Sequence, residues 1–163
     1  MNKDINEIQI QLNNFTQDFS SLVISSLTNK NLPYTSYAPY IKYNNEFYFI
    51  ISKIAKHYEN LSTQPIASIM FIEDESKASN IFFRKRLTYA ISATLEIQDE
   101  AVKNEFVKEF GDMVNMLFKM DFLIVKCNLV NGLIVVGPGQ AYDIDESQHI
   151  IGQVRNPKGH GKK

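Results

Sequence analysis

The stretch that decides the fold runs from Ser68 to Ile97 and reads SIMFIEDESKASNIFFRKRLTYAISATLEI. It predicts a long β-hairpin, with a first strand over Ser68–Ile72, a polar acidic connection over Glu73–Asn80 and a second strand over Ile81–Ile97. Apolar residues alternate with mainly polar ones along the second strand, and strand side chains point alternately to opposite faces. We therefore expect one buried face and one polar face.

Two arginines mark the polar face of the second strand. Arg84 and Arg86 are two residues apart, so their side chains should emerge on the same side, about 6–7 Å from each other. Guanidinium groups are suited to bidentate binding of carboxylate or phosphate. The pair would suit an anion-binding site, but taken alone it is more typical of a solvated sheet face neutralised by acidic neighbours such as Glu73–Glu75.

Length and composition exclude several classes of protein. The 163 residues suffice for one domain, and a hydrophobic content of 44% is that of a globular chain. Lys and Arg number 17 against 18 acidic residues, which gives no reason to expect a nucleic-acid partner. No secretory signal and no apolar run of about 20 residues is present, so we expect a cytoplasmic protein without a membrane partner. The single cysteine, Cys127, excludes an internal disulfide and is expected to be a small buried residue.

The rest of the chain predicts an antiparallel barrel. Helical spacing of apolar residues predicts helices over Asp4–Phe19, Lys53–Leu61, Glu100–Phe110 and Asp112–Met120. Further strands are predicted over Ser21–Thr28, Leu32–Ile41, Glu46–Ser52, Phe122–Leu129, Leu133–Val136 and Gln140–Ile144. Val130-Asn131-Gly132 is typical of a hairpin turn. The pattern favours a mainly β (α+β) fold, a six- to seven-stranded antiparallel barrel with short helices, as a single domain over residues 1–150 with a polar tail over 151–163.

A small number of side chains are candidates for chemistry. His160 is flanked by glycines, which would let its imidazole approach a planar ligand closely, although a histidine in a chain end is usually without function. His57 lies within a predicted helix and is typical of a surface residue, and His149 has no supporting feature. Asp121 falls between a helix and an apolar strand, where it is either a helix-end residue or a partner for a histidine from elsewhere. No catalytic triad, phosphate-binding loop or dinucleotide motif is present.

Several stretches together carry a family resemblance. They are SLTNKNLPYTSYAPY, AKHYENL, SIMFIEDE, IFFRKRLTY, FGDM with KMDF, GPGQAYDID and the tail PKGHGKK, in this order from about Ser20 to the end of the chain. In this combination the chain resembles the HugZ/HutZ-type haem-utilisation proteins of the pyridoxamine-5′-phosphate-oxidase-like split-barrel superfamily. Gly137-Pro138-Gly139 departs from the family pattern, which more often has an aromatic residue between the glycines.

The resemblance implies a homodimer of split β-barrels with haem bound near each cleft between subunits. It implies that His160 is the axial ligand of the haem iron and that Asp121 of the second subunit accepts a hydrogen bond from this histidine. It further implies that Arg86 meets a haem propionate, with Arg84 and Lys85 beside it. His57 matches a family position with a secondary role.

The function implied is that of a haem oxygenase, which opens the porphyrin ring to a biliverdin-type product and releases iron. O₂ and an external reductant would be its other partners, because no NAD or flavin motif is visible. Two alternatives remain open. One is an FMN-binding oxidoreductase in which Arg84, Lys85 and Arg86 hold the FMN phosphate, and the other is a haem carrier or storage protein without turnover.

Overall fold

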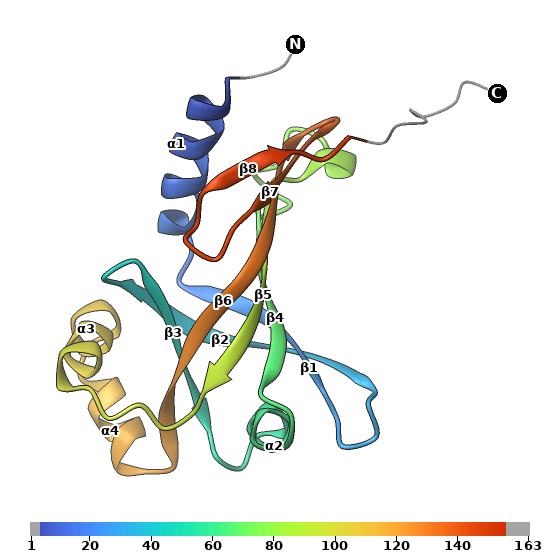
Figure 1. The fold of residues 1–163 in the computed structure, drawn as a ribbon. Coiled ribbons are helices and arrows are strands. Elements are labelled where there is room, and N and C mark those ends of the chain that lie inside the picture. The colour runs from blue at the N-terminus through green and yellow to red at the C-terminus, as the bar shows by residue number, and fades with distance from the viewer. Residues whose placement is uncertain (1–3, 156–163) are drawn as a thin grey trace.

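The structure, a computed structural model, describes residues 4–155. Six antiparallel strands form a closed barrel in the order β3-β2-β1-β4-β5-β6, because β3 also pairs with β6 (Figure 1). These strands are β1 (Ser21–Leu27), β2 (Pro33–Tyr43), β3 (Glu46–Ser52), β4 (Ile66–Ile72), β5 (Arg86–Thr94) and β6 (Phe122–Gly137). The predicted antiparallel barrel is confirmed.

Two further strands extend the sheet beyond the barrel. β6 is 16 residues long: its first half pairs with β3, and its second half pairs with β7 (Gln140–Ile144). β8 (Ile150–Gln153) then pairs with β7. The sequence pattern did not predict β8, and the sheet continues past residue 150 into the segment expected to form the tail.

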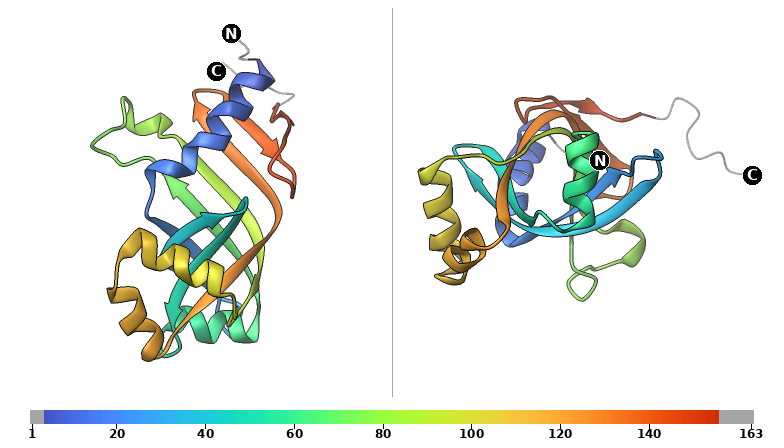
Figure 2. Two further views of the ribbon diagram at one scale, coloured as in Figure 1. Left: turned by 90° about the vertical axis from the view of Figure 1, so that its left-hand side faces the viewer. Right: turned by 90° about the horizontal axis from the view of Figure 1, so that it is seen from below.

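In the described part of the chain, four helices cover parts of this sheet. α1 (Ile5–Phe15) continues into a 3₁₀ turn, η1 (Thr16–Asp18), and lies beside β8, whereas α2 (Lys56–Thr63) lies at the lower end of the barrel (Figures 1 and 2). α3 (Glu100–Phe110) and α4 (Met113–Lys119) lie outside the barrel and pack on a second apolar cluster with β2, β3 and β6. Asp99 caps α3, as predicted, since its Oδ1 accepts hydrogen bonds from the N–H groups of Ala101 and Val102.

The barrel interior is filled by the apolar faces of its strands. In β5 the alternation is as predicted, because the side chains of one parity are buried: Leu87, Tyr89, Ile91 and Ala93. Neighbouring aromatic rings pack at centroid distances of 4.8–6.2 Å, among them Tyr40, Phe47, Phe71 and Tyr89. Cys127 is buried in this core as expected, and burial raises the pKa of its thiol.

The predicted hairpin turn at Val130-Asn131-Gly132 is wrong. β6 runs through it without reversing, and a register shift opposite Ala90 and Ile91 accommodates Val130 as an extra residue in β6. The glycine serves close packing, since a Cβ on Gly132 would lie 2.5 Å from Cδ1 of the Tyr89 ring.

The predicted second strand of the central hairpin begins too early. Residues Ile81–Phe83 form a 3₁₀ turn, η2, and β5 begins only at Arg86. The Asn80 side chain accepts a hydrogen bond from the N–H of Phe82 and so stabilises the turn. At the other end, Glu96 has a φ of 56°, which is incompatible with a continuing strand.

Candidate functional site

Arg84 lies outside β5 and fastens the β4–β5 connection. Its Nε and Nη2 donate to the carbonyl oxygen of Glu73, and its Nη1 lies 3.2 Å from Oε1 of Glu75. The expectation that Arg84 and Arg86 share one strand face is therefore wrong, because Arg84 lies between η2 and β5, outside the strand. Arg84 contacts residues of the Glu73–Glu75 run, which the sequence suggested as its acidic neighbours.

Arg86 and Lys85 are better placed to meet an external anion. Arg86 is the first residue of β5, is half-buried, and donates from Nη1 to the carbonyl oxygen of Arg84 at 3.1 Å. Lys85 is exposed, and its backbone N–H donates to a carboxylate oxygen of Glu73 at 3.2 Å. Within residues 4–155, neither side chain forms an ion pair. These two free cations are suited to bind the carboxylate or phosphate group of a ligand.

Two cavities adjoin the same connection. One, of about 680 Å³, lies between η1 and the connection and is lined by Phe15, Phe19, Arg84 and Lys85 together with the acidic run Glu73–Glu75. The other, of about 490 Å³, is lined by apolar, cationic and polar residues and by one acidic residue, among them Glu73, Lys77, Phe83, Lys85 and Val136. Lys85 lines both cavities.

Asp121 lies between α4 and β6, at the lower end of the barrel. Its Oδ2 accepts a hydrogen bond from the Ser52 hydroxyl, and its carbonyl oxygen accepts one from the N–H of Lys53 at 3.0 Å. The hydroxyl bond lowers the pKa of the Asp121 carboxyl, so this group is ionised at neutral pH. It lines a cavity of about 360 Å³ with Phe118 and Met120, where it can accept a further hydrogen bond.

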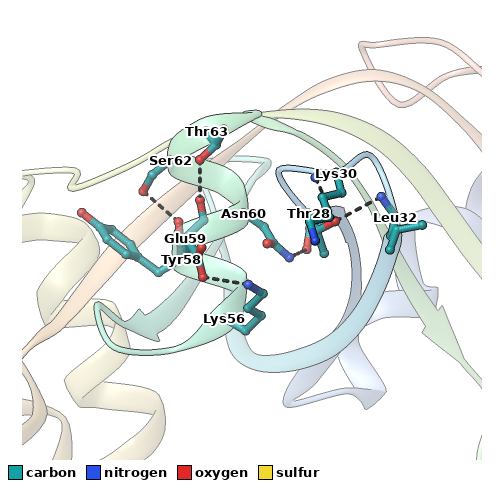
Figure 3. A network of polar contacts seen from close by, with 10 residues as sticks. Thr28, Lys30, Leu32, Lys56, Tyr58, Glu59, Asn60, Ser62 and Thr63 are labelled. Carbon is teal, nitrogen blue, oxygen red and sulfur yellow. Dashed lines mark hydrogen bonds and ion pairs between the residues drawn. The ribbon is translucent and has the colours of Figure 1, made fainter.

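His57 lies against β2, and hydrogen bonds from α2 to the barrel strands hold it there. Its Nδ1 lies 2.9 Å from the Ser36 hydroxyl, and partial burial lowers the pKa of the imidazole. One turn later, Asn60 donates to the buried Ser26 hydroxyl at 3.0 Å (Figure 3). The helix surface carries an ion pair between Lys56 and Glu59. His57 is therefore a neutral, partly buried residue at neutral pH.

Within residues 4–155, a single chain does not bring Arg86 together with Asp121. Arg86 pairs with Val135, whereas Asp121 immediately precedes Phe122 at the other end of β6. Thirteen strand positions separate Phe122 from Val135, which corresponds to about 40 Å at 3.3 Å per residue. His57 and Asp121 belong to the lower end of the barrel, and Arg84–Arg86 belong to the upper end (Figure 1).

The described chain ends near the row of Arg86. The N–H of Val154 donates to the carbonyl oxygen of Ala141 at 2.8 Å, and Ala141 pairs with Val135. Three strand spacings separate Arg86 from this end of the chain, or about 15 Å. His160 lies outside the described residues. Within them, no cluster of three or more His, Cys, Asp and Glu side chains could hold a metal ion, and no helix could cross a membrane.

Sequence reasoning missed two structural features, one at each end of the barrel. Ser52 had no motif to mark it, and its contact with Asp121 depends on a pairing across 69 residues. The apolar run Ile81–Phe83 was visible, but it was assigned to the strand, where alternate residues would have been buried. These three apolar residues do not alternate with polar ones, and this was the available sign that they do not lie in a half-buried strand.

The fold and the amino-acid sequence together define the family of this protein. The family model described as pyridoxamine 5′-phosphate oxidase matches residues 8–126, and the chain belongs to this family. It is 31% identical over 160 residues to the heme oxygenase HutZ of Vibrio cholerae, covering 95% of this chain and 90% of that protein.

Two solved structures are similar over much of the chain. The crystal structure of Campylobacter jejuni ChuZ has a TM-score of 0.84 and 32% identity, covering 96% of this chain and 67% of ChuZ. A crystal structure of Vibrio cholerae HutZ, described as a heme storage protein, has a TM-score of 0.68 and 31% identity, covering 72% of this chain and 87% of that one. The predicted resemblance to the HugZ/HutZ type is confirmed.

Proposed function

We propose that this chain forms a homodimer that binds haem between its subunits and degrades it as a haem oxygenase, using O₂ and an external reductant. The observation that supports this most directly is the identity of 31% to a heme oxygenase over 95% of the chain. Haem is in this proposal the substrate as well as the ligand.

The residues at the upper end of the barrel fit the periphery of haem. Haem is a flat apolar ring with two carboxylates at one edge. Arg86 and Lys85 carry no acidic partner within residues 4–155, and Arg86 is fixed by its bond to the carbonyl oxygen of Arg84. We assign the propionates to these cations, with Arg84 holding the connection in shape and His57 in a secondary role at the other end.

The length of β6 supports a His160–Asp121 contact between two chains rather than within one. His160 follows Val154 by six residues, and six extended residues span about 20 Å. Measured along β6, Asp121 lies about 40 Å from the row where Val154 is bound, roughly twice the reach of these six residues. A second copy, oriented in the opposite direction, would supply the missing carboxylate.

In this arrangement the protein's residues bind and orient. Asp121, ionised and held by Ser52, would accept the N–H of the His160 imidazole and so set which ring nitrogen faces the iron. Arg86 would set the orientation of the ring within its plane through a propionate. Bound haem supplies the redox chemistry of its iron.

A hemin titration followed at the Soret band tests the proposal. The native protein should bind hemin saturably, and His160→Ala should lose the spectrum of histidine-ligated haem while its circular dichroism stays unchanged. Asp121→Asn should still bind hemin but with about 10- to 100-fold weaker affinity or turnover, the range typical of residues that orient a metal ligand. Unchanged affinity in His160→Ala would remove this histidine from the site.

Two other functions have specific support. The description of HutZ as a heme storage protein favours a carrier, in which bound haem would survive addition of ascorbate in air. The family's description as an oxidase of pyridoxamine 5′-phosphate favours an FMN-binding protein, with Arg84, Lys85 and Arg86 near the phosphate. A native protein that binds FMN and not hemin would select the second of these.

A further inference from the structure

Three consecutive apolar side chains stand on the surface of the β4–β5 connection. Ile81, Phe82 and Phe83 are 56%, 83% and 43% exposed. The connection projects away from the barrel (Figure 2). An exposed run of this kind is unfavourable in water unless a ligand or partner covers it.

Hydrogen bonds fix the backbone of the turn that carries these side chains. The carbonyl oxygen of Asn80 accepts a hydrogen bond from the N–H of Phe83 at 3.1 Å, and its side chain accepts one from the N–H of Phe82 at 3.0 Å. Arg84, the next residue, is fastened to Glu73 and Glu75. A contact surface whose backbone is already fixed loses less conformational entropy on binding.

Cations flank the apolar surface. Lys77 and Lys85 line the cavity of about 490 Å³ with Phe83, Val136 and Pro138. Neither ammonium group forms an ion pair within residues 4–155. Glu73 also lines this cavity, and its carboxylate accepts the backbone N–H of Lys85. Aromatic and apolar walls with a cationic rim complement a flat apolar ring that carries carboxylates at one edge.

We propose that Phe82 and Phe83 contact the porphyrin ring, while Lys77 and Lys85 meet its carboxylates. This inference rests on the proposed function and extends it, because it adds Lys77, Phe82 and Phe83 to the site and makes the ring itself, rather than the iron, the group recognised there. Binding at this turn should then be independent of iron ligation.

Titrations with hemin and with iron-free protoporphyrin IX separate the ring from the iron. A Phe82→Ala/Phe83→Ala double variant should bind both compounds about tenfold more weakly, which corresponds to about 1.4 kcal/mol of binding free energy. His160→Ala should weaken hemin alone. Ile10→Ala, which removes another exposed apolar side chain, from α1, is the control and should bind both as the native protein does.

The outcomes are distinct. If the native protein binds both compounds and the double variant binds them equally well, the inference is wrong. If light scattering shows that the double variant has lost its second subunit in the absence of porphyrin, the turn packs on another copy of the chain, and the inference is also overturned. A native protein that binds neither compound overturns the haem proposal together with it.

Discussion

At the scale of single residues, Gly132 shows how closely the barrel wall is packed. A Cβ at this position would lie 2.5 and 2.6 Å from two carbons of the Tyr89 ring and 2.9 Å from the carbonyl oxygen of Thr88. Tyr89 is fully buried, so its ring could move only by displacing its packed neighbours.

Gly132→Ala should therefore destabilise the fold by about 1–3 kcal/mol, the usual cost of overpacking a core. Gly152→Ala in β8 is the matched control, because nothing lies within 4 Å of a Cβ there. Urea denaturation of the two variants measures the difference. Equal stabilities would show that β6 moves away from Tyr89.

His57 should make stability depend on pH. Burial lowers the pKa of its imidazole, so the unfolded chain binds a proton more readily than the folded one below the ordinary histidine pKa of about 6.5. Stability should fall as the pH is lowered through about 6.5, and His57→Gln should reduce this fall. Melting temperatures at pH 7.5 and pH 5.5 measure it. A variant with the native pH dependence would place the titrating group elsewhere.

At the scale of elements, Gln9 connects α1 to the outer sheet. Its Oε1 accepts the N–H of Ile150 at 2.9 Å, and its Nε2 donates to the carbonyl oxygen of Gln148 at 3.0 Å. The amide thus joins the first helix to β8, the strand from which the C-terminal segment leaves.

Gln9→Ala should loosen β8 without unfolding the barrel. The Ile150 amide should exchange with deuterium faster, while amides of β5 keep their native rates. Gln11→Ala, two residues along the same helix, is the control. If exchange at Ile150 is unchanged, α1 does not secure β8.

Local patterns predicted most elements because the apolar spacing is strong. The bounds of β3 and α3 match the predicted Glu46–Ser52 and Glu100–Phe110. β8 was missed because the strand is only four residues long and its residues are mixed in polarity. The turn at Asn131-Gly132 was wrong because the glycine is required by Tyr89, a residue 43 positions away that a local motif does not reveal.

At the scale of the whole molecule, the length of β6 governs the candidate site. The sequence indicated Asp121 and Arg86 as separate candidates, and the family resemblance placed them near one ligand. In the structure, Arg86 pairs with Val135 near one end of β6, whereas Asp121 precedes the other end, about 40 Å away measured along the strand. Sequence patterns could not give this separation, because it depends on β6 continuing through the predicted turn.

The central claim is therefore that each haem site takes His160 from one chain and Asp121 from the other. A mixed dimer of one His160→Ala chain and one Asp121→Asn chain, isolated with two affinity tags, tests this directly. If each site takes His160 from one chain and Asp121 from the other, one site of the mixed dimer carries both substitutions and the other site carries neither.

The measurement is the rate at which haem leaves the mixed dimer for apomyoglobin. We expect two phases of equal amplitude, one as slow as that of the native protein and one as fast as that of the His160→Ala homodimer. If the native slow phase is absent and both phases match those of the two variant homodimers, both residues act within one chain, and the account is wrong.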